Sequence, residues 1–200
     1  MLLLAGAILA ASAHAAPTIL VMGDSLSAEY GLARGKGWVA LLEQRLKDKR
    51  LDYSVVNASI SGETSSGGAA RMADALARNK PAVVIIELGG NDGLRGLALP
   101  ATRANFEAMI KASQQSGAKV LIAGMQLPPN YGPQYTREFA AMFGEVAISH
   151  KAALVPFLLQ GVADRADADS LFQADRIHPR AEAHPTLLNN VWPRLLPLLG

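Results

Sequence analysis

The sequence has no cysteine and few aromatic residues. Phe, Trp and Tyr together make up 6% of its 200 residues. The absence of thiols excludes disulfides, thiolate metal ligands and a cysteine nucleophile. The net charge is only +2, and cations and anions are interspersed, as in residues 43–50. A nucleic-acid-binding surface needs clustered cations on one face, so no nucleic-acid partner is expected.

Long hydrophobic runs are also missing. The apolar run over residues 2–11 is shorter than the roughly 20 residues that span a bilayer, and no later segment matches that pattern. Residues 1–16 are apolar and end near Ala13-His14-Ala15, which resembles a signal-peptidase site, although no Lys or Arg precedes the run. We therefore expect a signal peptide over 1–16, one domain over 17–200, and a periplasmic or secreted protein without stable membrane insertion. A retained hydrophobic tail is the alternative.

Short apolar runs alternate with helical patterns along the rest of the chain. The expected strands cover residues 18–22, 53–56, 82–88, 120–123 and 153–156. The expected helices cover residues 38–47, 67–78, 101–116, 137–151 and 183–198. This alternation predicts an α/β fold with a parallel sheet covered on both faces. Ligands of such sheets bind beyond the carboxyl ends of the strands.

Polar, glycine-rich segments stand at those strand ends. Three of them follow the first three expected strands and one lies near the C-terminus: 23–27, 57–64, 89–93 and 175–179. Together they supply a hydroxyl, backbone N–H groups, a carboxamide and a carboxylate–imidazole pair. Each segment alone is consistent with a helix cap or a turn. Four such segments in chain order, three of them at predicted strand ends, favour a catalytic site.

Ser25 and His178 are the candidate nucleophile and base. A serine hydroxyl is a poor nucleophile until a base accepts its proton, and histidine is the usual base. Asp175, three residues before His178 on a loop, is placed to accept a hydrogen bond from Nδ1–H and leave Nε2 facing the serine. The other histidines lie in the expected signal peptide, in a helix and in a proline-broken stretch: His14, His150 and His184.

An oxyanion formed at this site needs fixed hydrogen-bond donors, and the loss of one typically costs about 3 kcal/mol. The Ser25 N–H, the Gly62 N–H and the Asn91 side-chain amide are the three candidates. Gly62 suits close approach because it has no Cβ.

The four segments resemble the blocks of the GDSL/SGNH hydrolase family, which is named for Ser, Gly, Asn and His. The matching residues here are Ser25, Gly62, Asn91 and His178. Residues 56–62, 87–96 and 129–132 are similar to the secreted thioesterase I, lysophospholipase and arylesterase branch. The resemblance implies a flavodoxin-like three-layer α/β/α sandwich with about five parallel strands. It also implies a Ser–His–Asp triad that acts through an acyl-enzyme without metal or cofactor.

The resemblance implies small-molecule acyl substrates and favours a monomer. Members of the branch act on acyl-CoA and other thioesters, lysophospholipids, and aryl or short-chain esters. The family's flexible substrate loop maps to residues 93–98, with its two glycines, Gly93 and Gly96, as a hinge. Apolar residues after the third and fourth expected strands are candidates for an acyl groove, with packing at its rim as the alternative: Leu94, Leu97, Leu127 and Tyr131.

Glu29 departs from the branch, which usually has Gly at this position. Its carboxylate is expected either to disfavour anionic substrates or to point into solvent.

Other functions fit the sequence less well. A carbohydrate acetylesterase would use the same catalytic residues, but sugar sites favour exposed aromatic side chains, which are few here. A non-catalytic periplasmic ligand-binding module is disfavoured by the complete catalytic set. A nucleotide site is disfavoured because no Gly-x-Gly-x-x-Gly follows a strand.

Overall fold

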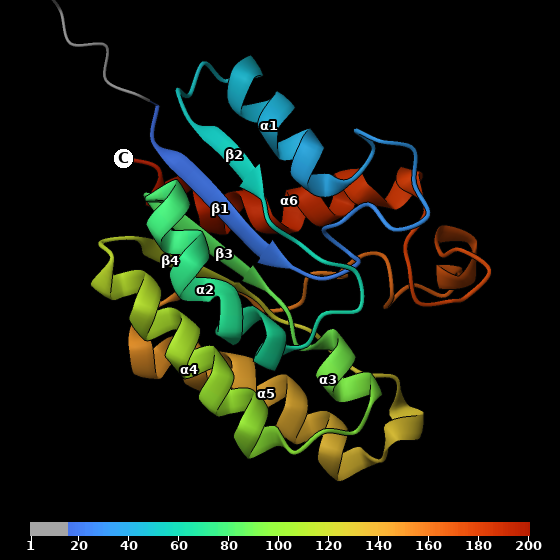
Figure 1. The fold of residues 1–200 in the computed structure, drawn as a ribbon. Coiled ribbons are helices and arrows are strands. Elements are labelled where there is room, and N and C mark those ends of the chain that lie inside the picture. The colour runs from blue at the N-terminus through green and yellow to red at the C-terminus, as the bar shows by residue number, and fades with distance from the viewer. Residues whose placement is uncertain (1–15) are drawn as a thin grey trace, which may run out of the picture.

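The computed structural model describes residues 16–200, in which five short strands form one parallel sheet. The strand order is β2-β1-β3-β4-β5. The second strand is therefore added on one side of β1, and the later strands are added on the other side, beginning with β3. All neighbouring pairs are parallel, and the arrowheads of β1, β2 and β3 in Figure 1 point toward the same edge of the sheet. The strands are β1 (Thr18–Gly23), β2 (Ser54–Asn57), β3 (Val83–Glu87), β4 (Lys119–Ala123) and β5 (Ala153–Val155).

Helices cover both faces of this sheet (Figure 1). On one face α1 (Trp38–Asp48) packs against α6 (His184–Leu195). On the other face α4 packs against both α2 and α5. The three helices of that face are α2 (Ser65–Asn79), α4 (Leu99–Gln115) and α5 (Pro133–His150). The arrangement is a three-layer α/β/α sandwich, which confirms the predicted fold class.

The apolar runs become strands because both sheet faces are covered. Residues 19–22 of β1 and 83–86 of β3 are completely buried, and most of them are β-branched. Strands buried on both faces carry continuous apolar runs rather than alternating ones. The helices are amphipathic instead, and α1 buries Trp38, Leu42 and Leu46, which are spaced four residues apart along one face.

Proline explains several differences between the expected and the observed helices. Helices α4 and α5 begin earlier than expected, each with a proline in its first turn, where the missing N–H costs no intrahelical bond. Helix α6 has a proline at its start and another, Pro193, inside it. The expected loop after β3 instead contains a short helix, α3 (Gly90–Leu94).

The expected signal peptide lies almost entirely in residues 1–15, outside the described residues. Within residues 16–200, every helix is too short or too polar to traverse a lipid bilayer.

Candidate active site

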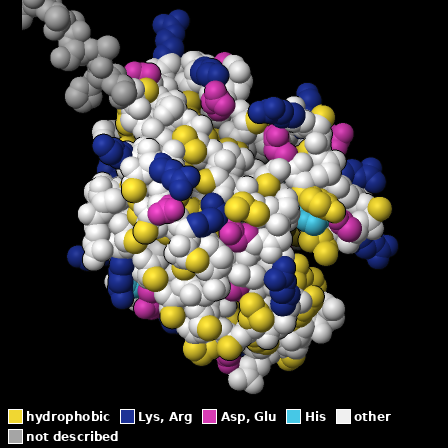
Figure 2. All heavy atoms as spheres, in the orientation of Figure 1, with side chains coloured by type: hydrophobic (Ala, Val, Ile, Leu, Met, Phe, Trp, Pro, Cys, Tyr) yellow, Lys and Arg dark blue, Asp and Glu magenta, His cyan; other side chains and the backbone are white. Residues whose placement is uncertain are grey.

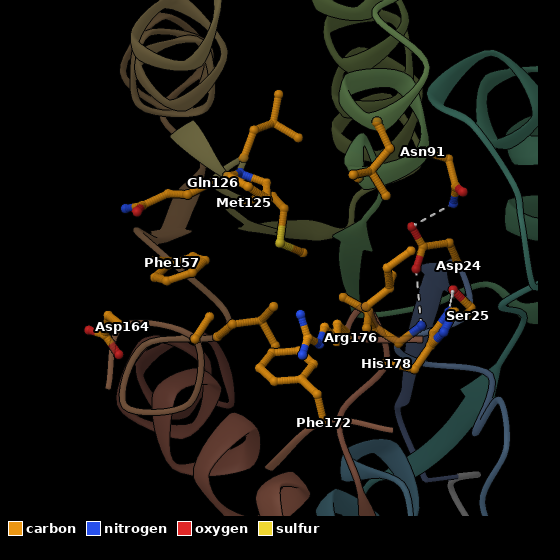
Figure 3. A pocket seen from close by; sticks show the side chains of 18 of the residues that line it. Asp24, Ser25, Asn91, Met125, Gln126, Phe157, Asp164, Phe172, Arg176 and His178 are labelled. Carbon is orange, nitrogen blue, oxygen red and sulfur yellow. Dashed lines mark hydrogen bonds between the residues drawn. The ribbon is translucent and has the colours of Figure 1, made fainter. Parts of the chain in front are cut away.

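The four polar segments meet at the carboxyl edge of the sheet. Ser25 follows β1, Gly62 lies in the loop after β2, and Asn91 is in α3 directly after β3. His178 comes from the long segment between β5 and α6, and the close-up places it beside Ser25 (Figure 3). This edge includes the position between β1 and β3 where the strand order reverses, the usual ligand site of open α/β sheets.

Ser25, His178 and Asp175 form a continuous hydrogen-bonded chain. The distance from Ser25 Oγ to His178 Nε2 is 2.8 Å, and that from His178 Nδ1 to Asp175 Oδ2 is 2.6 Å. Asp175 Oδ1 accepts from the backbone N–H groups of Ile177 and His178, both at 3.0 Å. With Nδ1–H donated to a carboxylate, Nε2 is the acceptor for the serine proton.

Hydrogen bonds keep Asp175 ionised. Burial by itself raises the pKa of this carboxyl, but the bonds from the His178 backbone and ring and from the Ile177 N–H outweigh it and lower the pKa to about 2. Arg176 makes the bend possible, because its left-handed backbone (φ 57°) turns the chain between the acid and the base. The bend closes with a bond from the Gln173 N–H to the His178 carbonyl at 2.8 Å.

Asp24 organises the turn that carries Ser25. Its Oδ1 accepts from the Leu26 N–H at 3.0 Å, and its carbonyl accepts from the Ala28 N–H at 2.9 Å. An aspartate that bonds the backbone two residues ahead stabilises a tight turn. The serine therefore stands on a fixed corner between β1 and the loop before α1.

Two of the predicted oxyanion donors are backbone N–H groups without an acceptor among residues 16–200. In the part of the chain that the structure describes, the N–H groups of Ser25 and Gly62 donate to no other protein group. Gly62 has φ of 79°, a left-handed conformation that favours glycine. The Arg95 guanidinium donates to the Gly62 carbonyl at 2.9 Å, which fixes the orientation of this peptide.

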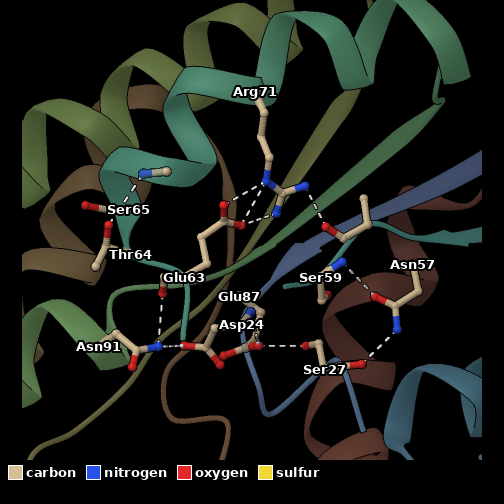
Figure 4. Close-up of polar contacts among 12 residues, drawn as sticks. Asp24, Ser27, Asn57, Ser59, Glu63, Thr64, Ser65, Arg71, Glu87 and Asn91 are labelled. Carbon is tan, nitrogen blue, oxygen red and sulfur yellow. Dashed lines mark hydrogen bonds and ion pairs between the residues drawn. The ribbon is translucent and has the colours of Figure 1, made fainter. Parts of the chain in front are cut away.

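The side-chain amide of Asn91 is already engaged (Figure 4). Its Nδ2 donates to Asp24 Oδ2 at 3.1 Å and to the Glu63 carbonyl at 3.0 Å. Both of its hydrogens thus point to protein acceptors, so the third predicted donor lies at the site but is not free. An oxyanion that binds Asn91 has to compete with one of these two acceptors.

A cavity of about 480 Å³ opens beside Ser25 and His178. In Figure 2 hydrophobic side chains and a histidine surround a hollow on one side of the molecule. Polar groups enter the wall only at Gln126, Asp164 and Arg176 besides the residues of the Ser25 site. The apolar part of the wall comes from Leu94, Met125, Leu127, Phe157, Leu159, Phe172 and Ile177.

Of the residues predicted to bind substrate, Leu94 and Leu127 line this cavity, and Gly93, Leu97 and Tyr131 do not. Gly93 is buried within α3, where an added Cβ would collide with Leu127 and Phe139, so close helix packing explains this glycine. Leu97 is 40% exposed on the outer surface. Tyr131 belongs to a 3₁₀ turn, Pro129–Tyr131, of which only the first residue reaches the wall.

Comparison with known proteins places the chain in a family. The model of the GDSL-like lipase/acylhydrolase family matches residues 21–185, which includes Ser25, Gly62, Asn91 and His178. The chain belongs to this family. It is therefore an enzyme of the hydrolase class, as the resemblance of its four blocks predicted.

Relatives of this hydrolase match over most of their length. The chain is 56% identical to "Esterase TesA" of Pseudomonas aeruginosa, over 92% of this chain and 90% of the relative. It is 37% identical to "Thioesterase 1/protease 1/lysophospholipase L1" of Escherichia coli K12, over 94% and 88%. The crystal structure of TesA superposes with a TM-score of 0.87 at 55% identity, over 91% of this chain and 99% of that one. A psychrotrophic esterase EstA from Pseudoalteromonas sp., inhibited by monoethylphosphonate, has a TM-score of 0.85 at 37% identity, over 91% and 98%.

Glu29 of this hydrolase holds the loop before α1 in place through hydrogen bonds. Its carboxylate accepts from the backbone N–H groups of Gly35 at 3.1 Å and Gly37 at 2.7 Å. The side chain therefore closes the loop before α1. It does not point freely into solvent, so that expectation for Glu29 was wrong, and Glu29 is not among the residues that line the cavity beside Ser25.

Two buried acids beneath Ser25 were not predicted as functional. Asp24 is 2% exposed and Glu87 is fully buried. Burial raises the pKa of Asp24 to about 6, although the Leu26 N–H and His178 lower it in part. Burial and the nearby Asp24 raise the pKa of Glu87 well above its ordinary value. An acid at the end of the apolar run 83–86 is the sequence signal that points to Glu87.

Sequence reasoning also missed several cavity-lining residues. Met125, Phe157 and Leu159 follow the ends of β4 and β5, so the rule that ligands bind beyond the strand ends could have indicated them. Phe172 lies far along the segment after β5, and no local pattern marks it.

Proposed function

We propose that this hydrolase cleaves carboxylic esters and thioesters through an acyl-enzyme on Ser25, with His178 as general base and acid and Asp175 as the group that orients it. The contact of 2.8 Å between Ser25 Oγ and His178 Nε2, continued to Asp175 at 2.6 Å, carries this proposal. A nucleophile bonded to a base that is itself oriented by a carboxylate is the arrangement that activates serine.

In the first step, Ser25 Oγ attacks the acyl carbonyl carbon while His178 Nε2 takes the hydroxyl proton. The tetrahedral intermediate collapses when its C–O or C–S bond breaks and His178 returns the proton to the leaving alcohol or thiol. In the second step, water attacks the acyl-enzyme and gives its proton to His178. The acid leaves when His178 protonates Ser25 Oγ, which restores the enzyme.

The N–H groups of Ser25 and Gly62 stabilise the oxyanion in both steps. Their freedom from protein acceptors supports this role, because a donor aimed at the transition state must not be committed elsewhere. The Asn91 amide serves as the third donor by exchanging its bond to Asp24 or to the Glu63 carbonyl for one to the oxyanion.

The cavity next to Ser25 takes the acyl chain. Its largely apolar wall, including Leu94 and Leu127, suits a hydrocarbon group, whose burial stabilises the complex by about 0.8 kcal/mol per methylene. The proposed substrates are aryl and short- to medium-chain esters, acyl-CoA thioesters and lysophospholipids. The names of the relatives, which include an esterase and a thioesterase/lysophospholipase, support this range.

The mature enzyme is proposed to work outside the cytoplasm as a monomer. The signal-peptide pattern over residues 1–16 supports export and leaves the domain 17–200. N-terminal sequencing of the exported protein tests this, and a mature protein that still begins at residue 1 would contradict it.

A fluorophosphonate probe tests the nucleophile. We expect the wild-type chain to be labelled at Ser25, since the probe reacts only with an activated serine, and peptide mass spectrometry locates the adduct. Ser66→Ala, an exposed serine of α2, is the control for a serine that lies outside the catalytic chain. Labelling of folded Ser25→Ala at the wild-type rate would overturn the assignment.

A further inference from the structure

Glu87, a fully buried residue, ends β3, and its carboxyl group lies beside Asp24 and Ser27 (Figure 4). Glu87 Oε2 accepts from the Ser27 hydroxyl at 2.6 Å and from the Asp24 N–H at 3.3 Å. Its other oxygen, Oε1, is buried and has no hydrogen-bond partner among residues 16–200. Buried side-chain oxygens almost always have a partner, so this half-bonded carboxyl requires an explanation.

Among residues 16–200, no positively charged group acts on Glu87. From the loop after β1, Asp24 and Ser27 face it, and Ser27 Oγ also receives the Trp38 indole N–H of α1 at 3.1 Å. The loop after β2 contributes the buried hydroxyl of Ser59, which also lacks a partner within the described chain. Ser27, Ser59 and Glu87 oxygens all lie within 3 Å of the place that a Cβ on Gly23 would occupy, so they converge on that glycine.

Other charged groups near this pair lie on the far side of Asp24. His178 and Asp92 of α3 act on Asp24, and neither is among the groups that affect Glu87. A buried carboxylate without a cation and with few donors is strongly disfavoured relative to the neutral acid. Two neighbouring buried carboxyls are also disfavoured from ionising together.

We propose that Glu87 is a positioning residue of this hydrolase, and that its protonated carboxyl group holds the Asp24–Ser25 turn in the geometry that the serine–histidine contact requires. The proposal rests on the catalytic roles given above to Ser25 and His178. Glu87 does not touch the reacting atoms and acts through Asp24.

The coupling between Glu87 and the site runs through one peptide group. The Asp24 N–H is shared between the Glu87 carbonyl at 3.2 Å and its Oε2 at 3.3 Å. The Asp24 carboxylate in turn orients the Leu26 N–H and the Asn91 amide. Ionisation of Glu87 places a second negative charge against Asp24 in the protein interior, and repulsion then displaces the turn that carries Ser25.

This coupling predicts loss of activity at alkaline pH. Burial, followed by the charge of Asp24, raises the pKa of Glu87 far more than the Ser27 and Asp24 hydrogen bonds lower it. Together with the unpartnered burial of its carboxyl group, this favours the neutral acid, and the contribution that form makes is lost as the pH rises through the pKa of the folded state.

The kinetic test compares wild type with Glu87→Gln between pH 7 and 10. Gln keeps an oxygen acceptor for the Ser27 hydroxyl and the Asp24 N–H but does not ionise. We expect the ratio of kcat for Glu87→Gln to kcat for wild type to rise with pH, approaching about tenfold for each pH unit above the pKa of Glu87. Glu43→Gln, an exposed carboxyl of α1, is the matched control and keeps the wild-type profile. A ratio that does not change with pH overturns the positioning role.

An infrared measurement on the wild type keeps the test independent of the variant's folding. Chain labelled with ¹³C-glutamate should show a protonated carboxylic-acid band at pH 8, because Glu87 is the one glutamate within residues 16–200 that is fully buried, and Glu63 is paired with Arg71. The absence of that band overturns the proposal. The band reports on Glu87 whether or not Ser25 is the nucleophile, so failed probe labelling of Ser25 is a separate result that overturns only the proposed function.

Discussion

At the scale of single residues, the site separates its acids by environment. Asp175 receives three hydrogen bonds and stays ionised, with its pKa lowered to about 2. Asp24 receives fewer and is buried, so its pKa rises to about 6. Carboxyl groups with pKa values pushed apart take different roles within one site. In the proposed mechanism, Asp175 orients the base and Asp24 holds the turn that carries the proposed nucleophile.

Asp175→Asn should lower kcat by about 10³- to 10⁴-fold with the fold retained, because an amide stabilises neither the correct tautomer nor the imidazolium. Steady-state hydrolysis of a p-nitrophenyl ester measures this effect. Asp169→Asn, an exposed aspartate of the same segment, is the control. Near-wild-type kcat for Asp175→Asn would show that His178 does not depend on this carboxylate.

Asn91→Ala should reduce kcat by about a hundredfold or more if its amide reaches the oxyanion, with a smaller change in KM. In the structure the Asn91 amide donates only to Asp24 and to the Glu63 carbonyl. This variant therefore distinguishes an amide that also stabilises the oxyanion from one that only holds these two groups in place. Affinity for a phosphonate transition-state analogue should fall in parallel with kcat. A change confined to KM would assign Asn91 to substrate binding.

At the scale of elements, one buried histidine joins α1 to α6. His184 begins α6 and is 2% exposed, and its Nδ1 accepts from the Trp38 N–H that starts α1, at 3.0 Å. Both helices lie on the same face of the sheet. The bond requires an unprotonated Nδ1, so this contact is sensitive to acid.

The free energy of unfolding should decrease at acidic pH because His184 becomes protonated more readily in the unfolded chain than in the folded one. Burial lowers the pKa of His184, and the Pro179 carbonyl and Glu29 offset this only in part. Between that pKa and the unfolded value of about 6.5 the unfolded chain binds more protons, so stability decreases as the pH falls below 6.5. Thermal unfolding from pH 8 to 5 should show a smaller loss of Tm for His184→Gln than for wild type. His150→Gln, at the end of α5, should follow wild type, and parallel curves for His184→Gln would refute this role.

At the scale of the whole molecule, the cavity is lined by residues from distant parts of the chain. Leu94 follows β3, Met125 follows β4, and Phe157 and Phe172 come from the long segment after β5. The sandwich brings these segments to the edge where Ser25 stands. If the cavity binds the acyl chain as proposed, the preferred acyl-chain length depends on several loops together.

Lengthening the acyl chain should raise kcat/KM by about fourfold per methylene until the cavity is filled, from about 0.8 kcal/mol of burial per methylene. Ala163→Trp, at the cavity wall, should move the optimum to shorter chains. Ala166→Trp lies outside the wall and should leave the optimum in place. A series of p-nitrophenyl esters measures both, and an optimum that Ala163→Trp does not move would place the acyl chain elsewhere.

The amino-acid sequence by itself determined the sheet, the family and the local chemistry. Apolar runs such as 83–86 specify strands because their side chains must be buried on both faces. The Asp175–His178 contact spans three residues, so its geometry is largely a local property of the chain. The blocks around Ser25, Gly62 and Asn91 were sufficient to predict the family to which the chain belongs.

Only the tertiary structure decided how the remaining polar groups are used. Glu87 lies against Asp24, which is 63 positions away in the chain, and its burial follows from the packing of β3 between β1 and β4. The Glu29 carboxylate accepts hydrogen bonds from N–H groups of its own loop. The Asn91 amide donates to two groups, Asp24 and the Glu63 carbonyl, that no local sequence pattern connects to it. Burial and hydrogen-bond partners arise from contacts between distant segments, and a linear pattern does not contain those distances.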